Sequence, residues 1–354
     1  MRVNEARAAA ADWIREHGGR TPGFRGAYFS GSTVDLPADA EVPPGSDTDV
    51  MLVVDGPGPA AKPGKFRHRG ALLEVTVVPW ESLASPEHVL SSYHLATPFR
   101  TDTVIADPTG DLGRLRARVA AGFAEPRWVL RRRAEARARV EHGLRDLADG
   151  RVDPERSWPA LVLGWLFPTG VTTHVLLVAG LRNPTVRLRY VATRELLTTH
   201  GTPDRHEELL RLLGSHRLTA ERAEHHLRAL AATFDAAAEV ARTPFPFGSD
   251  LTAAARPIAV DGSLARIRAG DHREIAFWLA ATFARCHLVL DADAPAALRE
   301  AHRPAFAELL ADLGIRTAED LRARAEAVLR FLPTLDAWAD ELLPPAEAGH
   351  GAPA

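Results

Sequence analysis

The stretch YFSGSTVDLPADAEVPPGSDTDVMLVV, residues 28–54, decides how the chain is interpreted. It places Gly31 and Ser32 after an apolar run, then a polar loop broken by prolines, then Asp47 and Asp49 directly before a second apolar run. Successive side chains of a strand point to opposite faces, so Asp47 and Asp49 point the same way. Two carboxylates on one face, at the mouth of a strand, form an oxygen site suited to Mg²⁺.

A third carboxylate, Glu74, lies inside the apolar run LLEVTVVP, residues 72–79. If this run is a strand beside the first, Glu74 can join the two aspartates, and a lone carboxylate buried there would be costly. Three carboxylates can hold two metal ions, or one ion and a general base, for an in-line phosphoryl displacement. The alternative is that Asp47 and Asp49 cap a strand while Glu74 is a satisfied buried carboxylate.

The Gly31-Ser32 turn supplies a second requirement of phosphoryl chemistry. A glycine lets the backbone approach a phosphate closely, and backbone N–H groups at a turn or helix start are ready anion donors. The turn and the carboxylates together therefore predict a site for a nucleoside triphosphate and its metal.

Strand and helix signals divide the chain into two parts. After a helix at residues 1–19, ended by Gly18-Gly19, strands are expected at 24–30, 49–55 and 72–79, and 103–112 predicts a short strand followed by a helix start. From about Ala120 the pattern is helical, rich in Ala, Leu, Arg and Glu. Helices are expected at 125–150, 183–201, 219–242, 271–291, 294–314 and 317–343, with an irregular insert at 242–263. The predicted class is α+β: a small mixed-sheet head at 1–120, an all-α bundle at 121–343 and a disordered tail at 344–354.

The composition excludes several classes of protein. With 354 residues, 46% hydrophobic and 25% charged residues, the chain has the composition of an ordinary folded protein. A net charge of -3 provides no global field for gripping nucleic acid. Cys286 is the only cysteine, which excludes an intramolecular disulfide and a cysteine-based zinc site, and we expect it to be a core thiol.

One uncharged segment of the chain could be a transmembrane helix by its length. Residues 158–180 carry no charged side chain and are long enough to span a bilayer. Pro168 and Gly170 are expected to divide the segment into two buried helices, and the start of the chain has no apolar signal region. We therefore predict a cytoplasmic protein with no membrane partner.

The motifs resemble the DNA polymerase β-type nucleotidyltransferase superfamily: Gly-Ser, a spacer, Asp-x-Asp opening an apolar strand, and an acidic residue on the next strand. Within it, GSTVD, SDTDVMLVV and LEVTVV are most similar to the streptomycin/spectinomycin adenylyltransferases. The likeness covers about residues 25–80. It implies a catalytic head followed by a helical substrate-binding domain.

The resemblance also implies roles for individual residues. Asp47 and Asp49 would bind Mg²⁺, and Glu74 would be the third carboxylate and the base toward the acceptor hydroxyl. Gly31 and Ser32 would contact the triphosphate of ATP or another NTP. Three further residues are predicted to bind this co-substrate: Ser46 beside the first aspartate, and Arg187 and Arg189 from the second domain.

The other polar clusters have plainer interpretations. A solvated hairpin, or alternatively a phosphate clamp, is predicted from Lys62, Lys65, Arg67, His68 and Arg69. A solvated helix face is predicted from Arg131, Arg132 and Arg133. The second domain is expected either to close over the triphosphate or to form surface ion pairs through Arg187, Arg189 and Arg194. His174, His225 and His226 are expected to be structural, and Trp165 and Trp278 to be core residues or cleft lining.

The expected activity is Mg²⁺-dependent transfer of a nucleoside monophosphate to a hydroxyl of a small molecule. Between Gly26 and Ala61 the chain has six acidic residues and no Lys or Arg, which predicts an acidic rim that attracts a polycation such as an aminoglycoside. That acceptor would make the protein an antibiotic-resistance enzyme. The alternatives are an antitoxin-like nucleotidyltransferase that modifies a protein or RNA, and a biosynthetic enzyme acting on an uncharged natural-product intermediate. The sequence assigns no oligomeric state.

Overall fold

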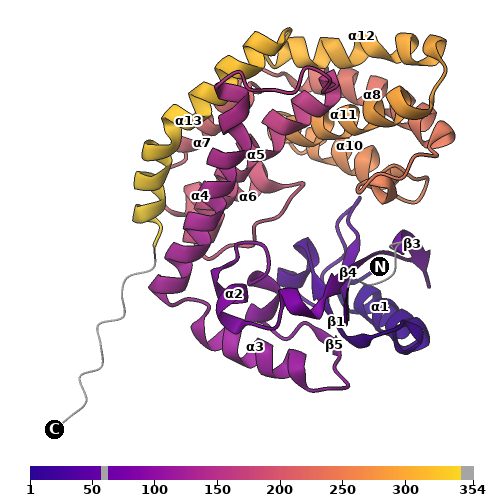
Figure 1. The fold of residues 1–354 in the computed structure, drawn as a ribbon, viewed down its shortest axis with the longest axis vertical. Helices are drawn as coiled ribbons and strands as arrows, with labels where there is room; N and C mark the ends of the chain where they lie inside the picture. Colours follow the sequence, from indigo (N-terminus) through magenta and orange to yellow (C-terminus); the bar gives the residue numbers. More distant parts are fainter. Residues whose placement is uncertain (57–62, 344–354) are drawn as a thin grey trace.

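The computed structural model describes residues 1–56 and 63–343. Its N-terminal part, which we call the sheet region (residues 1–125), contains a mixed sheet with helices, and its C-terminal part, the helical region (residues 126–343), is built of helices (Figure 1). This arrangement confirms the predicted α+β class. The division predicted at residue 120 falls inside the last helix of the sheet region, and the predicted tail lies outside the described residues.

The sheet has five strands in the order β3-β4-β2-β1-β5. β2 and β4 are parallel neighbours, whereas the β1–β2, β1–β5 and β3–β4 pairs are antiparallel. The three expected strands and the short fourth one are all present. Their bounds are β1 (Phe24–Ser30), β2 (Thr48–Val54), β3 (Gly64–His68), β4 (Ala71–Pro79) and β5 (Val104–Ala106).

Both faces of the sheet are covered. α1 (Val3–His17) packs across one face, where Ala10 and Ile14 meet alternate strand residues such as Leu52 and Leu73. The other face packs on α2 (Pro86–Ser91), α3 (Asp111–Gly122), the short helices η3 (Trp80–Ser82) and η4 (Thr97–Arg100), and the first turn of the helical region. Burial on both faces explains why β2 reads as an almost continuous apolar run.

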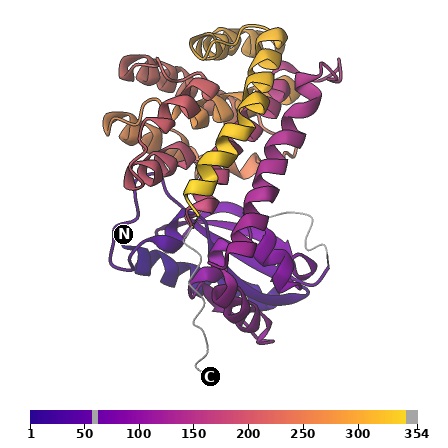
Figure 2. The same cartoon turned by 90° about the vertical axis from the view of Figure 1, so that its left-hand side faces the viewer.

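The helical region forms one large core around a central helix, α5. Figures 1 and 2 show α4 and α13 side by side, with the lower end of α4 meeting the sheet region. The helices are α4 (Pro126–Ala148), α5 (Trp158–Ala179), α6 (Arg189–Thr199), α7 (Arg205–Leu213), α8 (Ala220–Val240), α9 (Arg256–Ala259), α10 (Asp261–Arg268), α11 (Ala276–Asp293), α12 (Ala296–Asp312) and α13 (Ala318–Glu341). The sequence pattern did not indicate α7, and residues 183–188, expected to be helical, are not.

The predicted division of residues 158–180 into two helices is wrong, because α5 runs unbroken through Pro168. The proline ring packs against Gly143 of α4, and Gly170 admits the ring of Phe277 and the side chain of Arg189. Packing on all sides therefore outweighs the hydrogen bond that the proline removes. α5 is long and apolar enough to cross a membrane, but 78% of its most apolar 18-residue segment is buried inside the protein.

The expected solvated face of α4 is wrong at one residue. Arg132 is fully buried and donates to the backbone carbonyls of Leu90 and Phe123, at the ends of α2 and α3. Its guanidinium also lies over the Phe123 ring. Arg132 thus fastens the helical region to the sheet region rather than facing water.

Candidate active site

The predicted carboxylates meet in one row across the sheet. Strand register places Ser30 of β1 opposite Asp49 of β2, Asp49 beside Glu74 of β4, and Glu74 opposite Lys65 of β3. Asp47 lies just before β2, and one carboxylate oxygen from each of Asp47, Asp49 and Glu74 lies within 4.8 Å of the others. The three acidic residues expected to converge therefore do so.

Gly31 is required by the packing around Asp49. Its φ of 71° lies in the left-handed region, and a Cβ at this position would overlap the Asp49 carboxylate. Only glycine combines this backbone conformation with so close an approach. The short helix η2 (Ser32–Asp35) begins immediately afterwards. Gly31 and Ser32 line the same cavity as the carboxylates.

The expectation that Lys65 belongs to a solvated hairpin is wrong. β3 and β4 do form a hairpin, but the Lys65 side chain is 6% exposed and points into the site. Its Nζ forms ion pairs with Glu74, with Asp250 Oδ1 at 2.7 Å and with Asp47 Oδ2 at 3.3 Å. Lys62 of the same cluster lies outside the described residues.

Asp250 brings the helical region into the site. It ends the short helix η5 (Gly248–Asp250), within the insert expected to be irregular. Its Oδ1 accepts from Lys65, while its Oδ2 accepts from Arg285 Nη1 of α11 at 2.8 Å. Arg285 in turn lies over the Trp278 ring. The sheet and the helices are thus joined by charged contacts at the edge of the carboxylate cluster.

Burial and mutual repulsion change the acidity of the carboxylates. The pKa of Asp49 is raised well above its usual value, first by burial and then by the charges of Asp47 and Glu74. Burial also raises the pKa of Glu74, although the charge of Lys65 opposes the shift. Burial would lower the pKa of Lys65, but its carboxylate neighbours outweigh burial and raise it. Among the described residues, no Lys, Arg or His forms an ion pair with Asp49.

The predicted arginines separate into three environments. Arg187 lines the site and donates from Nη2 to Ser46 Oγ at 3.3 Å, while its Nη1 has no hydrogen-bond partner among the described residues. Arg189 instead faces the helical core, where its guanidinium lies over the Phe277 ring and Nε donates to a backbone carbonyl. Arg194 pairs with acidic residues of the helical region.

Two predicted co-substrate residues therefore lie outside the cavity wall. Arg189 starts α6 and turns away from the extended segment that carries Arg187, so its side chain does not line the cavity as predicted. Ser46 contacts Arg187 but does not line the cavity itself. Of the predicted co-substrate residues, Gly31, Ser32 and Arg187 line the cavity.

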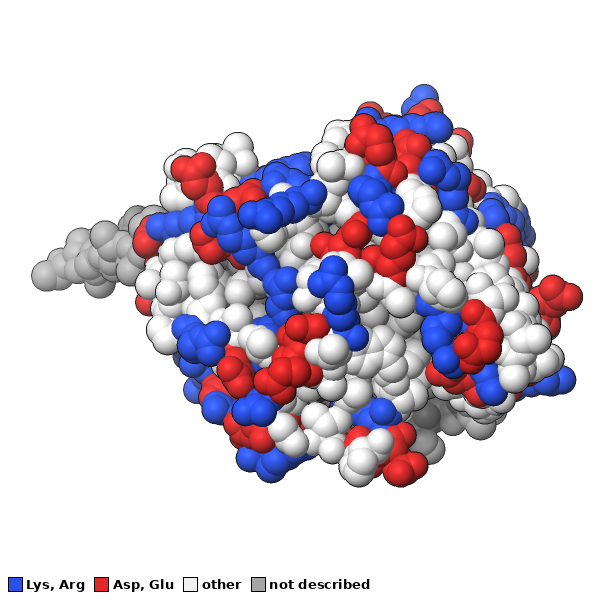
Figure 3. Space-filling model, turned by 90° about the horizontal axis from the view of Figure 1, so that it is seen from above, with Lys and Arg blue, Asp and Glu red and all other residues white. Residues whose placement is uncertain are grey.

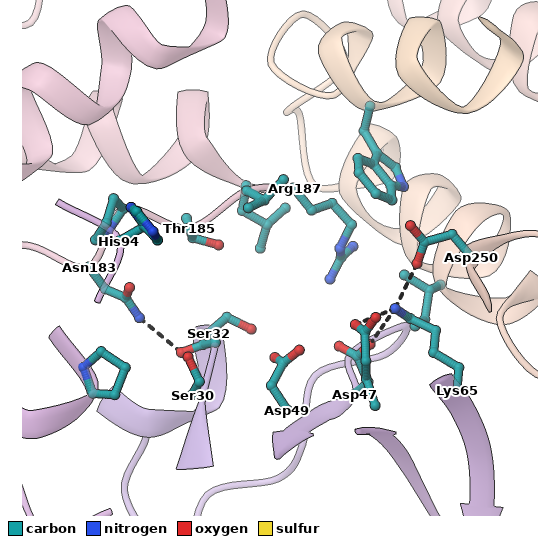
Figure 4. Close-up of a pocket in the computed structure, with 18 of the residues that line it drawn as sticks. Ser30, Ser32, Asp47, Asp49, Lys65, His94, Asn183, Thr185, Arg187 and Asp250 are labelled. Carbon is teal, nitrogen blue, oxygen red and sulfur yellow. Dashed lines mark hydrogen bonds and ion pairs between the residues drawn. The ribbon is translucent and has the colours of Figure 1, made fainter. Parts of the chain in front are cut away.

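These residues surround a cavity of about 360 Å³ between the sheet and the helices (Figure 4). At one end lie His94, Asn183 and Thr185, and Asn183 Nδ2 donates to the Gly31 carbonyl at 2.9 Å. At the other end lie Lys65 and Asp250. The carboxylates of Asp47 and Asp49 occupy the floor, and Arg187 reaches in from the opposite wall (Figure 4).

The expected acidic rim is not formed. Asp35 pairs with Arg100 and Asp55 with Arg25. Asp39 and Glu41 are exposed but do not line the cavity, because their loop pairs with the start of the chain through the Arg2–Glu41 bridge. Figure 3 shows basic and acidic side chains interspersed over one face of the molecule. Of the predicted rim acids, Asp35 and Asp55 are therefore paired with arginines, and Asp39 and Glu41 lie outside the cavity lining.

The remaining predictions concern three histidines, the cysteine and two tryptophans. Each histidine has a protein partner: His174 contacts the Thr185 carbonyl, and His225 and His226 contact carboxylates of α12. Cys286 and Trp165 are fully buried in the helical core, whereas Trp278 is mostly buried but also lines the cavity.

The hairpin turn sets the position of Lys65. Arg69 and Gly70 both have positive φ, 47° and 86°, as in a two-residue turn between antiparallel strands. A two-residue turn fixes the register, so counting back from Arg69 and forward from Gly70 places Lys65 opposite Glu74. Asp250 has no comparable signal, because it reaches the site through long-range packing alone.

No protein-family model, curated protein or solved structure compared with the chain matches it.

The residues present fit Mg²⁺ and a triphosphate. The ligand set of Asp47, Asp49 and Glu74 is oxygen-only, and Asp49 lacks a protein cation among the described residues. A divalent cation at that position would compensate a carboxylate that burial penalises. On the opposite wall, Arg187 lines the cavity and brings a positive charge toward the carboxylates, as an anionic phosphate group requires.

Proposed function

We propose that the protein is a Mg²⁺-dependent nucleotidyltransferase that moves a nucleoside monophosphate, AMP from ATP, to a hydroxyl of a small molecule. The observation that carries the proposal is the row of Asp49 and Glu74 on neighbouring strands, with Asp47 beside them and Gly31 packed against Asp49. This is the arrangement of carboxylates and close backbone that phosphoryl transfer requires.

Bound Mg²⁺, held by Asp47 and Asp49, would offset charge on the phosphates as the leaving oxygen departs. Glu74 accepts the proton of the acceptor hydroxyl, and its raised pKa suits a general base. The acceptor oxygen then forms a bond to the α-phosphorus, while the bond from that phosphorus to pyrophosphate breaks. Gly31 and Ser32 contact the phosphates from one wall, and Arg187 contacts them from the other.

The two ends of the cavity have different roles in this proposal. Because a general base must reach the hydroxyl that it deprotonates, the acceptor lies at the Glu74 end, beside Lys65, Asp250 and Trp278. The triphosphate lies toward Gly31, and the rest of the nucleotide lies toward His94 and Asn183. A cavity of about 360 Å³ between two parts of the chain suits a small acceptor.

Among small acceptors, an aminoglycoside-like antibiotic and an uncharged natural-product intermediate are both candidates. The first would make the protein a cytoplasmic antibiotic-resistance enzyme. Both oxygens of Asp250 are already paired with cations, so this acid does not itself favour a polycation. Modification of a protein or RNA is the second function, in which the cavity would receive a single exposed side chain or nucleotide.

The test is a labelling experiment with the full chain, Mg²⁺ and ATP carrying ³²P at the α-phosphate. The panel contains aminocyclitol and aminoglycoside antibiotics, uncharged polyols, total RNA and a protein lysate. Mg²⁺-dependent label on a small molecule, absent with Asp49→Asn, supports the proposal. Label on RNA or protein alone would replace the acceptor class, and no transfer of label to any member would contradict nucleotidyl transfer.

A further inference from the structure

Lys65 holds an unusual position for a basic residue in a metal-binding cluster. Its Nζ lies between three carboxylates: it contacts Glu74, Asp47 Oδ2 at 3.3 Å and Asp250 Oδ1 at 2.7 Å, and its side chain is 6% exposed. Figure 4 shows the side chain reaching from β3 to the edge of the carboxylate group. A buried cation fixed by three partners belongs to the site rather than to the surface.

The contacts of Lys65 take the oxygens that a second metal ion would need. Two-metal phosphoryl-transfer sites hold two ions about 4 Å apart, and shared carboxylates coordinate both ions. In this chain, one oxygen of Asp47 and one of Glu74 already face the ammonium. Asp49 has no protein cation among the described residues, and the second oxygen of Asp47 is not engaged by Lys65. The cluster is therefore divided into a metal side and an ammonium side.

Lys65 is kept in place from both parts of the protein. The two-residue turn at Arg69-Gly70 sets its register opposite Glu74, and Asp250 reaches it from the helical region. Arg285 holds the other oxygen of Asp250, so the acid cannot turn away without breaking a second ion pair. These restraints make the ammonium a fixed feature of the site.

We propose that the Lys65 ammonium takes the place of the second metal ion. The site then binds a single Mg²⁺ at Asp47 and Asp49, and Glu74 remains a base oriented by Lys65. This inference rests on the proposed function, because it takes Mg²⁺ as the cation. It adds that the reaction uses one metal ion and that Lys65 replaces the second.

The experiment counts bound ions directly, with Mn²⁺ as the probe. Electron paramagnetic resonance measures free Mn²⁺ while the ion alone is titrated into the full chain without nucleotide. The wild type is expected to bind one Mn²⁺ per chain, and Lys65→Met, which keeps the length of the side chain without its charge, is expected to bind two. Lys65→Arg retains the positive charge and is expected to bind one.

Arg67→Met is the matched control, because it removes one positive charge from the same strand at an exposed position that does not line the cavity. It is expected to bind one Mn²⁺ with the wild-type affinity. Thermal unfolding of each variant with and without Mn²⁺ provides a second measurement. Lys65→Met is expected to gain more stability from saturating Mn²⁺ than the wild type or Arg67→Met.

The outcomes separate this inference from the proposed function. Two Mn²⁺ ions bound by the wild type, or one bound by Lys65→Met, would overturn the role of Lys65 and leave nucleotidyl transfer standing. No Mn²⁺ bound by the wild type would overturn the metal site and both proposals. If Lys65→Met does not fold, a wild-type count of one supports the proposal and a count of two overturns it.

Discussion

Two clusters of carboxylates in this protein, one buried and one half-buried, behave in opposite ways. In the helical region, Asp271 and Glu274 are each about 2% exposed and lie beside basic residues: Arg194 contacts both, Arg266 pairs with Asp271, and His206 contacts Glu274. Burial would raise the pKa of Glu274, but His206 and Arg194 lower it to about 2. The charges of this cluster are satisfied within the fold.

The cluster in the cavity is built differently. Lys65 pairs with Asp47, Glu74 and Asp250, and Arg285 pairs with Asp250. Asp49 has no basic partner among the described residues, and its pKa is raised. Burial alone therefore does not distinguish an acid that can bind a cation from one that serves the fold. An acid that the protein leaves without a counter-charge is the one able to bind a cation.

The largest effect is expected from Asp49→Asn. Losing a metal ligand removes several kcal/mol of transition-state stabilisation, so Mg²⁺-dependent turnover should fall by at least about 10³-fold. The melting temperature of the metal-free variant should not fall, because the substitution removes repulsion from Asp47 and Glu74. Initial rates and thermal unfolding measure the two effects. The control Asp39→Asn, at an exposed loop position outside the cavity, should leave turnover and melting temperature unchanged. Wild-type turnover in the Asp49→Asn variant would refute the metal site.

Glu74→Gln should act on chemistry rather than on nucleotide affinity. Removing a general base lowers kcat by roughly 10²–10⁴-fold. The Kd for ATP, measured by equilibrium titration, should change little because Gly31 and Arg187 are untouched. Lost ATP binding with undiminished single-turnover chemistry would show instead that Glu74 serves only as a metal ligand.

In the helical cluster, Glu274→Gln should reduce stability and leave turnover intact. The pKa of Glu274 is lowered from 4.5 to about 2, so its charge stabilises the fold above pH about 4.5, and this contribution disappears as the pH falls toward 2. The shift corresponds to about 3 kcal/mol at pH 7. Denaturant unfolding at several pH values measures the loss, with Glu239→Gln at an exposed position of α8 as the control. A loss that is equal at pH 7 and pH 2.5 would assign the effect to packing instead of charge.

The smallest effect is expected from Mg²⁺ itself. At ten times its Kd, a ligand that binds only the folded state adds about 1.4 kcal/mol to the free energy of unfolding. The wild type and Glu274→Gln should both gain this increment in thermal unfolding, whereas Asp49→Asn should gain none. An equal gain in all three proteins would mean that Mg²⁺ acts outside the cavity.

Much of the site was predictable because it depends on short-range patterns. The period of two in β2 places Asp47 and Asp49 on one face, and the apolar run around Glu74 identifies the neighbouring strand. Gly31 was predicted as a phosphate contact, and the structure adds that its missing side chain makes room for Asp49.

The errors arise where tertiary packing overrides a local rule. Pro168 predicts a helix break, yet the surrounding helices keep α5 continuous. Arg132 lies in an arginine run that reads as solvated, but backbone carbonyls at the ends of α2 and α3 draw it inside. Asp250 lies 185 residues beyond Lys65, and no local pattern encodes a contact at that separation.

The turn at Arg69-Gly70 has a consequence for how the length of this chain can change. An insertion in the loop before β2, residues 36–46, leaves the pairing of the five strands untouched, since none of these residues belongs to the sheet. One residue added to the two-residue turn would shift β3 by one place against β4 and turn Lys65 toward α1, on the opposite face of the sheet. The loop at residues 36–46 can therefore vary in length. The turn at Arg69-Gly70 has to keep its two residues, because the position of the Lys65 ammonium depends on that number.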